Sequence, residues 1–404
     1  MLAAMNPARE MLALRLQDAR ARTDELFRLV HPSAIYRRPV PDRHRLIFYL
    51  GHLEAFDWNQ ICRNALGEPS FRPQFDRLFE FGIDPEPGRA PSDTEADWPS
   101  RDRVEQYNRK ARRIIDERLA DAPDEILHVA IEHRLMHAET FAYLLHNLPY
   151  EDKLAPETSP SPITGPPAGL QWIEIPAGEA VLGRKRGDGF GWDNEFEEHA
   201  AAVRAFRLAK YKVTNGEFLD FVNSGGTAPH YWVARGGQWL YRGMFREMPL
   251  PLDWPVYATW EQAVAYTHWR GKRLMSEAEF HRAARDGLYP WGDTPPTPER
   301  GNFDFARWDP VPVNATPGGD SEYGVSQLVG NGWEWTSTVF APFAGFQAFP
   351  FYPGYSANFF DGRHYVLKGG SPRTAACLLR KSFRNWFRPN YPYVHASFRL
   401  AEDC

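Results

Sequence analysis

Hydrophobic residues recur at helical spacing along the first 150 residues of the chain. Four segments carry this pattern among charged residues, at 7–30, 43–66, 100–121 and 123–148. Apolar positions that repeat every three to four residues predict amphipathic helices. The last segment also opens on a Pro-Asp pair that suits a helix start. Four such helices joined by loops predict a four-helix bundle over residues 1–150.

The pattern changes after residue 150. Residues 151–167 repeat Pro, Ser and Thr without periodicity, which predicts a linker. From 168 to 404 the chain is rich in Gly, Trp and short aromatic stretches, with one clear helical pattern at 259–273. Many short strands and few helices predict an α+β domain in which loops dominate. We therefore expect a two-domain protein of the α+β class.

Composition narrows the range of functions. Hydrophobic residues at 43% and charged residues at 25% are typical of a soluble globular protein. The net charge of -5 and the lack of a Lys/Arg-rich tract argue against nucleic-acid binding. Three widely spaced cysteines, Cys62, Cys377 and Cys404, exclude a disulfide framework and fit a reducing compartment. Without a signal-peptide pattern or a membrane-length apolar run, we expect a cytoplasmic protein that acts on small molecules.

Histidines are the first candidates for chemistry. His133 and His137 are four residues apart in a predicted helix, so both imidazoles lie on one helix face. His52 belongs to the predicted helix at 43–66, and facing helices of a bundle can bring such side chains to one metal ion. Three neutral imidazoles suit Zn, Fe, Cu or Ni, so the spacing alone leaves the metal open. The alternative interpretation is that these are ordinary core histidines.

Other polar residues of the helix at 123–148 also have two interpretations. Glu132 and Glu139 are either acceptors for the ring N–H groups of metal-bound histidines or solvated helix charges. His128 and His146 are weaker candidates for metal ligands.

A series of motifs after residue 200 resembles a known family. In chain order the motifs are KYKVTNGEFLDFVN (210–223), HWRGKRLMSEAEFHRAAR (268–285), GNGWEW (330–335), VLKGGS (366–371), FRNWFRP (383–389) and SFRLA (397–401). The series resembles the formylglycine-generating enzymes, whose fold is a variant of the C-type lectin fold. Combined with a DinB-like bundle that carries a His…HxxxH set, the chain resembles the ergothioneine-type sulfoxide synthases.

This resemblance implies a metal and a reaction. Such enzymes bind Fe(II) through three histidines, which His52, His133 and His137 match. They use O2 to join a sulfur donor to C2 of the imidazole of hercynine (Nα-trimethylhistidine), and they oxidise the sulfur as they do so. Three protein ligands leave open positions on the metal for O2 and the donor.

The resemblance also assigns the substrate pocket to the second domain. Tyr352 matches the family's proton donor, and Tyr355 matches a wall for the trimethylammonium group. Aromatic faces suit a quaternary ammonium because it has no N–H to donate. Asn385 and Trp386 match the residues that contact the betaine end of hercynine. Each of these aromatic side chains, taken singly, is also a candidate for the core.

The expected donor pocket departs from the family pattern. Members that use γ-glutamylcysteine carry an Asp after Asn-Trp and an Arg four residues later, and these positions here hold Phe387 and Tyr391. Met136 stands where the family often has Gln before the second histidine. Loss of an acid and a guanidinium removes the contacts for an ionic donor. We therefore predict a selenoneine synthase that uses a neutral selenosugar, with Phe387 among the substrate-binding residues.

An ergothioneine-type synthase that uses cysteine or γ-glutamylcysteine is the alternative. Arg388 and Arg89 are candidate binders of a donor carboxylate, and either would favour an amino-acid donor. Both are equally consistent with surface arginines.

Three other functions fit parts of the sequence. A formylglycine-generating oxidase needs a cysteine pair near the C-terminus, and Cys377 has no near partner. A zinc hydrolase or a thiol transferase also fits three histidines with an open position. A non-catalytic lectin-like module is the remote alternative, with a structural Ca²⁺ held by carbonyls and Asn331 of the GNGWEW motif.

Overall fold

The computed structural model describes residues 6–83, 91–157 and 161–404. The chain forms two compact units, Met1–Glu157 and Thr158–Cys404. Arg89 lies outside the described residues. Within the described ranges, none of the helices combines the length and the apolarity that crossing a membrane requires.

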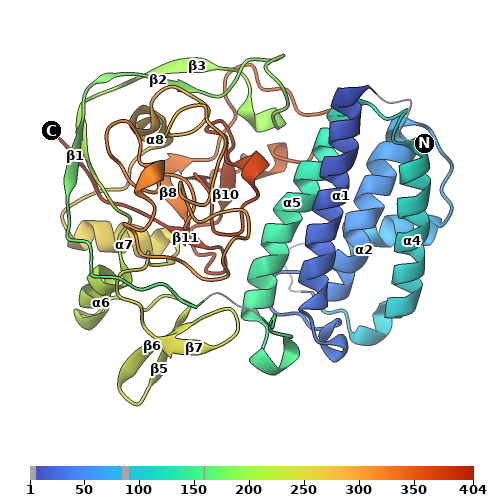
Figure 1. Cartoon of the computed structure of the whole chain (residues 1–404), viewed down its shortest axis with the longest axis horizontal. Coiled ribbons are helices and arrows are strands. Elements are labelled where there is room, and N and C mark those ends of the chain that lie inside the picture. The colour runs from blue at the N-terminus through green and yellow to red at the C-terminus, as the bar shows by residue number, and fades with distance from the viewer. Residues whose placement is uncertain (1–5, 84–90, 158–160) are drawn as a thin grey trace. The chain divides into compact units, whose positions relative to one another are not determined.

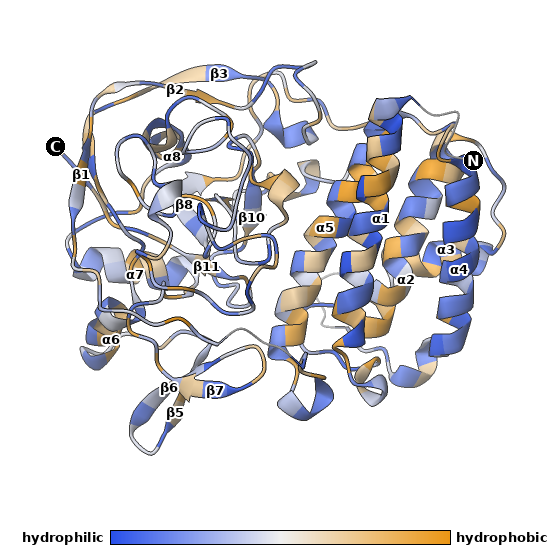
Figure 2. Ribbon diagram, in the orientation of Figure 1, coloured by the Kyte–Doolittle hydropathy of each residue, from blue (hydrophilic) through white to orange (hydrophobic). Residues whose placement is uncertain are grey.

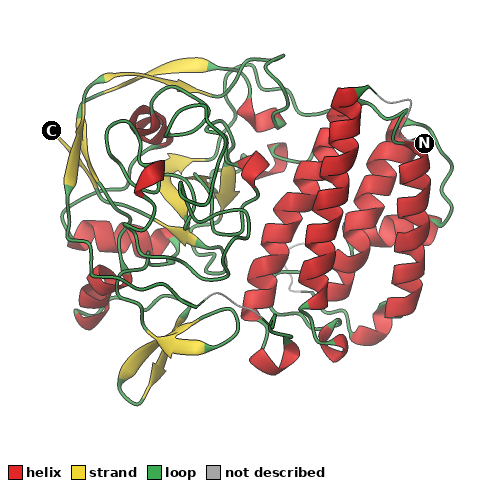
Figure 3. Cartoon of the chain, in the orientation of Figure 1, coloured by secondary structure: helices red, strands yellow, loops and turns green. Residues whose placement is uncertain are grey.

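The first unit is helical (Figures 1 and 3). Its four long helices are α1 (Pro7–Arg28), α2 (Leu46–Asp57), α4 (Arg101–Arg118) and α5 (Asp124–Asn147), and they confirm the predicted bundle. The short helix α3 (Pro73–Phe81) packs against α2 and was not among the predicted helices. Its nine residues make fewer than three turns, too few for a clear periodic pattern.

Helix α2 lies at the centre of this unit. All of its residues except Leu50 are buried, and Figure 2 shows it more hydrophobic than α4. Burial on nearly every side is typical of a core helix, and the polar residues His52, Glu54 and Asp57 of α2 are buried with it. After Asp57 the chain continues as a π-helical segment, Trp58–Ala65. The segment 43–66, predicted as one helix, thus contains an α-helix followed by a π-helical segment. π-Helical turns are common near functional sites.

The second unit contains four small sheets and much irregular chain (Figures 1 and 3). The sheet orders are β1-β4-β12, β10-β9-β8-β11, β2-β3 and β5-β6-β7. The strands are β1 (Trp172–Ile175), β2 (Gly178–Leu182), β3 (His199–Val203), β4 (Phe206–Ala209), β5 (Trp232–Arg235), β6 (Gln238–Arg242), β7 (Glu247–Pro249), β8 (Trp333–Val339), β9 (Tyr365–Lys368), β10 (Asn385–Phe387), β11 (Ala396–Ser397) and β12 (Ala401–Asp403). The strand content and the loops confirm the predicted α+β class.

Among the described residues of this unit, three α-helices accompany the sheets, and the sequence pattern located one of them. The predicted helix is α7 (Trp260–Trp269), and the additional ones are α6 (Asn215–Asn223) and α8 (Glu277–Ala284). Both additional helices begin with a capping box, in which a Ser or Thr side chain and a Glu three residues later satisfy each other's backbone N–H groups. The prediction of few helices is confirmed, and α6 and α8 had not been located because they are too short for periodicity to reveal.

The GNGWEW segment is structural in this fold. The Asn331 side chain is fully buried, and its Oδ1 accepts hydrogen bonds from Asn302 Nδ2 at 3.2 Å and from the Val311 N–H at 2.9 Å. Its Nδ2 donates to the Val311 carbonyl and to Gln327 Oε1. Both lone pairs of the amide oxygen are used, so the predicted calcium ligand is not supported.

Candidate functional site

The structure brings His52, His133 and His137 together inside the helical unit. His52 lies on α2 and the other two lie on α5, and one ligand nitrogen from each is within 4.8 Å of the other two. His52 Nε2 and His137 Nε2 are 3.3 Å apart. Among the described residues, this is the group of His, Cys, Asp and Glu side chains whose geometry suits a metal ion.

Burial keeps these imidazoles neutral. It lowers the pKa of His52 to about 4, and it holds the pKa values of His133 and His137 well below the usual range. The mutual repulsion that charged rings would suffer acts in the same direction. Three neutral rings at neutral pH offer lone pairs to a metal ion without first losing a proton.

The ring orientation of His52 is set by α3. Its Nδ1 lies 2.6 Å from the Phe79 carbonyl oxygen. Because a carbonyl oxygen only accepts, Nδ1 must carry the proton and Nε2 must carry the lone pair. A backbone carbonyl on the distal nitrogen is a common way to fix the tautomer of a metal-binding histidine.

Aromatic side chains hold the rings from the sides. Phe56 stacks on His133 with centroids 3.4 Å apart and planes 9° apart. Phe48 stacks on His52 at 4.8 Å and 25°. These apolar walls supply the burial that lowers the pKa values, and they restrict rotation of the imidazoles.

The nitrogen spacing fits a shared metal ion. Two nitrogens that each lie about 2.1 Å from one ion are about 3.0 to 3.4 Å apart, and the His52–His137 separation of 3.3 Å falls in that range. Within the described part of the chain, the buried Nδ1 of His137 has no hydrogen-bond partner. Three neutral imidazoles at this spacing suit a borderline divalent metal such as Fe²⁺ or Zn²⁺.

The other predicted residues of α5 have different surroundings. Glu132 and Glu139 are buried, so they are not the solvated charges of the alternative interpretation. Met136 is half-buried beside His137. The acceptor for the His52 ring N–H is Phe79, which the sequence analysis did not identify because a backbone carbonyl has no residue signature.

In the second unit, aromatic rings gather around the two predicted tyrosines. Tyr355 is buried and stacks on Trp192 with centroids 4.0 Å apart. Trp386 meets Tyr355 at 5.4 Å with its plane nearly perpendicular, and it stacks on Phe340 at 4.3 Å. The ring of Tyr352 is 5.6 Å from that of Tyr355. Tyr352, Tyr355 and Trp386 thus form one cluster, and Trp192 is a member that the sequence did not reveal.

Three distant segments build this aromatic cluster. The Ser356 hydroxyl donates to Asp193 Oδ1 at 2.5 Å, which ties the segment after Tyr355 to the segment of Trp192. Glu195 accepts from Arg380 at 2.5 Å and from the Ser382 hydroxyl at 2.6 Å. Burial alone would raise the pKa of the Glu195 carboxyl, but Arg380 and Ser382 hold it below its usual value. An ionised, fully bonded Glu195 fixes the segment that leads into β10.

Strand β10 contains three of the predicted substrate-binding residues, Asn385, Trp386 and Phe387, and all three are half-buried. The Asn385 side chain accepts a hydrogen bond from the Trp386 N–H at 2.9 Å. Phe387 stacks on Tyr391, with centroids 5.0 Å apart and planes 17° apart. Arg388 is exposed. The two positions at which the sequence departs from the expected family pattern therefore form one aromatic pair.

Comparison with known proteins identifies the relatives of this chain. Residues 163–404 match the sulfatase-modifying factor enzyme 1-like domain (FGE-sulfatase), and residues 15–172 match the DinB superfamily. The protein named hercynine oxygenase in Mycobacterium tuberculosis is 33% identical over 98% of this chain and 99% of its own length. The chain belongs to the hercynine oxygenase family.

Further relatives agree with this assignment. The hercynine oxygenase of Mycolicibacterium smegmatis is 31% identical over 98% of this chain and 99% of its own length. Ergothioneine biosynthesis protein 1 of Schizosaccharomyces pombe is 28% identical over 93% of this chain, which corresponds to 54% of that protein. The DinB-like and FGE-like fold prediction is confirmed.

Membership of the hercynine oxygenase family makes the chain an enzyme, a non-haem iron oxidoreductase that acts on small molecules. A zinc hydrolase and a non-catalytic lectin-like module are accordingly not supported. The residues present fit the iron on which the family depends, because three neutral imidazoles converge at ligand spacing.

We predict that Gly51→Ala weakens metal binding. A Cβ at Gly51 would lie 2.4 Å from the Phe79 ring, so the ring must shift. We expect this shift to disturb the Phe79 carbonyl that binds the His52 ring N–H. Alanine would ordinarily stabilise a helix interior by about 1 kcal/mol relative to glycine, whereas this clash should destabilise the protein by about 1–3 kcal/mol. Disturbing an outer partner of a ligand costs about 10–100-fold in metal affinity. Co(II) titration and thermal unfolding measure both effects.

Gly169→Ala is the matched control, because its Cβ would meet no atom within 4 Å. An unchanged Co(II) affinity in the Gly51 variant would show that the Phe79 contact does not support the site.

We also predict that acid destabilises the metal-free protein through these histidines. An unfolded histidine takes up a proton near pH 6.5, whereas His52 in the folded chain does so only near pH 4. Proton uptake therefore favours the unfolded chain as the pH falls from about 6.5 to 4. His52 alone should lower the free energy of unfolding by about 3 kcal/mol, with no further change below pH 4.

Urea unfolding of the metal-free protein between pH 7 and pH 4 measures this loss. The variant His52→Leu should show a smaller pH dependence over the same range. Equal slopes for the two proteins would contradict the neutral state of His52.

Proposed function

We propose that this chain catalyses Fe(II)- and O2-dependent bond formation between a sulfur donor and the imidazole C2 of hercynine. The observation that carries the proposal is the convergence of three neutral imidazoles in a chain that aligns over nearly its whole length with proteins named hercynine oxygenase. His52, His133 and His137 would hold the metal. Iron bound there supplies the one-electron chemistry that O2 activation requires.

Hercynine would bind to the aromatic cluster of the second unit. Its trimethylammonium group has no N–H to donate, so ring faces hold it by cation–π attraction. Tyr355 and Trp386 meet nearly at right angles, as two walls of such a cage do, and Trp192 supports Tyr355 from behind by stacking. The Asn385 amide at the same cluster offers N–H groups to the carboxylate of the betaine.

Tyr352 is the proposed proton donor. It is half-buried, and its ring lies 5.6 Å from that of Tyr355, so it belongs to the cluster that would hold the substrate. A phenol both donates and accepts hydrogen bonds, which suits a group that returns a proton as O2 is reduced.

The proposed reaction balances without another reductant. A thiol R–SH and the C2–H of hercynine lose their two hydrogens, a carbon–sulfur bond forms, and the sulfur gains one oxygen atom. The second oxygen atom of O2 leaves as water with those two protons. All four electrons that O2 accepts come from the two substrates.

A selenium donor is the second candidate, and the Phe387–Tyr391 stack favours it. Two stacked rings offer no charge to the ammonium and carboxylate groups of an amino-acid donor. They suit an uncharged donor such as a selenosugar, whose C–H faces pack on aromatic rings. The product in that case is the carbon–selenium analogue.

A donor comparison tests both candidates. The protein is loaded with Fe(II) without oxygen, mixed with hercynine and one of three donors, and then exposed to O2. The donors are γ-glutamylcysteine, cysteine and a selenosugar, and mass spectrometry detects the hercynine adduct. An adduct formed mainly from a thiol supports the ergothioneine-type reaction, and one formed mainly from the selenosugar supports selenoneine synthesis. Iron binding without an adduct from any donor would overturn the hercynine proposal.

A further inference from the structure

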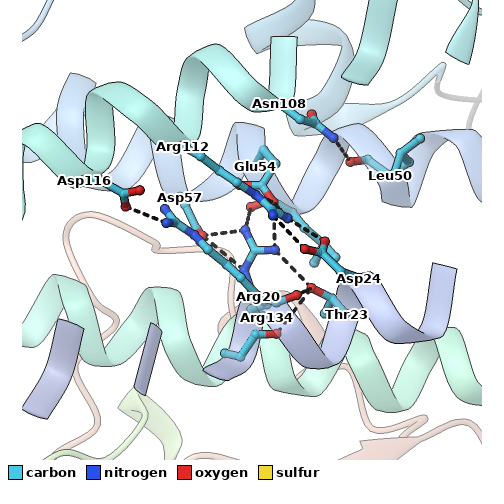
Figure 4. Close-up of polar contacts among 12 residues, drawn as sticks. Arg20, Thr23, Asp24, Leu50, Glu54, Asp57, Asn108, Arg112, Asp116 and Arg134 are labelled. Carbon is cyan, nitrogen blue, oxygen red and sulfur yellow. Dashed lines mark hydrogen bonds and ion pairs between the residues drawn. The ribbon is translucent and has the colours of Figure 1, made fainter. Parts of the chain in front are cut away.

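One arginine links the two helices that carry the three histidines. Arg134 directly follows His133 on α5, is fully buried, and reaches across to α2 (Figure 4). Its Nε and Nη2 donate to Asp57 Oδ2 at 3.2 and 2.6 Å. Its Nη1 donates to Glu54 Oε1 at 2.9 Å, and its Nη2 also donates to the Leu53 carbonyl at 2.9 Å. The acceptors Leu53 and Glu54 are the two residues that follow His52.

A second layer holds these acceptors in place. Arg112 of α4 donates to Glu54 Oε1 at 2.9 and 2.6 Å and to both oxygens of Asp24 on α1 at 2.7 Å (Figure 4). Thr23 of α1 accepts from Arg134 Nη1 at 3.3 Å. The network therefore connects all four long helices of the unit, and Arg134 is its member on α5, next to His133.

Charge supports the link between Arg134 and Glu54, whereas burial raises the pKa of the Asp57 carboxyl. Burial opposes ionisation of Glu54, but Arg134 and Arg112 overcome it and lower the pKa of the carboxyl to about 2.

Fold stability alone does not account for such a group. Burying an ion pair costs much of the hydration free energy of both ions. Proteins in which apolar residues of similar volume replace the pair are therefore often equally stable. Position is a better explanation, because the distance between His52 and the two histidines of α5 depends on the spacing and register of α2 and α5. A planar guanidinium with several fixed donors sets both quantities at once, which an ammonium group cannot do.

We propose that Arg134 is a positioning residue of the metal centre, which locks α2 against α5 so that the three imidazoles meet at one ion. The inference rests on the three-histidine centre of the proposed function but not on the identity of either substrate. It predicts that changes at Arg134 alter the metal site even where the fold survives.

The test compares Co(II) binding to metal-free variants of the full chain, through affinity and the visible absorption of the bound ion. Arg134→Lys keeps the charge but loses the planar fork, and we expect at least a tenfold weaker affinity and an altered spectrum. Arg112→Met is the matched control, because it removes a guanidinium from the same network without cutting the link from α5 to α2. It should lower the unfolding temperature and leave the cobalt spectrum unchanged.

A triple variant separates position from stability. Arg134→Met alone would leave Asp57 buried without the guanidinium that it binds, and Glu54 with Arg112 alone. Arg134→Met, Glu54→Gln and Asp57→Asn are therefore combined, which removes the charges of this link together. We expect a folded protein with weakened cobalt binding. Wild-type affinity and spectrum in both the Lys variant and the triple variant would overturn the inference. Failure of the wild-type chain to bind Co(II) would instead overturn the metal centre itself, whereas the donor comparison tests the substrates separately.

Discussion

Replacing His137 with alanine is expected to abolish tight metal binding and oxygen-dependent activity. Its ring lies closest to both partners, with centroids 4.4 Å from His133 and 4.7 Å from His52, whereas those two rings are 5.3 Å apart. Its Nε2 also makes the 3.3 Å approach to His52. Disturbing only an outer partner of a ligand costs about 10–100-fold, so loss of the ligand should reduce activity by at least about 100-fold. Metal content after anaerobic loading and O2 uptake with hercynine measure the two losses.

His128→Ala is the control for this prediction. His128 lies on the same helix and is half-buried, but it is not a member of the three-histidine cluster. It should keep iron content and O2 uptake near the wild-type values. A His137→Ala protein that retains one iron per chain would contradict the assignment, and a matching loss in the His128 variant would indicate general damage to α5.

The histidines were accessible to sequence analysis because one helical turn links two of them. The i,i+4 spacing of His133 and His137 alone determines that they share a face once α5 forms. His52 needed a further assumption, that two helices of a bundle face each other, and the resemblance to a family with three histidines supplied it. The separation of 3.3 Å between His52 and His137 depends on tertiary packing, which no local pattern contains.

The residues that hold these histidines in place could not be predicted in the same way. Phe79 acts through its carbonyl oxygen, and Gly51 acts by leaving room for the Phe79 ring, so neither role depends on a recognisable side-chain chemistry. The hydrogen bonds from Arg134 to α2 were not predicted for another reason. An arginine on an amphipathic helix usually faces solvent, and only the fold shows that this one is buried against two acids.

The second unit was predicted less completely, because its contacts join residues far apart in the chain. Trp192 stacks on Tyr355 across more than 160 positions. Strand β8 pairs with β9 only after the long segment 340–364, and it pairs with the more distant β11 in parallel. The family motifs located Tyr355, Asn385 and Trp386, but they carried no information about Trp192. The capping boxes that open α6 and α8 were a usable signal, and they would have located these two short helices.

Restoring the charges at Phe387 and Tyr391 should change the donor that the enzyme prefers. In the double variant Phe387→Asp, Tyr391→Arg, a carboxylate and a guanidinium replace a half-buried ring stack whose centroids are 5.0 Å apart. A charge-assisted hydrogen bond contributes about 1.5–3 kcal/mol, so each restored contact should raise kcat/KM for γ-glutamylcysteine by about 10–100-fold. The same change should lower kcat/KM for an uncharged selenosugar, because the donor loses two ring faces. Steady-state kinetics with both donors measure the ratio.

Charge and lost aromatic area must be separated in this experiment. The control variant Phe387→Leu, Tyr391→Leu removes the rings without adding charge, so it should weaken the neutral donor and leave γ-glutamylcysteine unimproved. Because the two residues stack on each other, their effects should not be additive, and each single variant should gain less than half of the free-energy change of the pair. Equal gains for both donors in the charged variant would mean that these positions control access to the site and not recognition of the donor. A donor ratio unchanged from wild type would place the donor elsewhere, and it would remove the Phe387–Tyr391 stack as the reason to favour selenium.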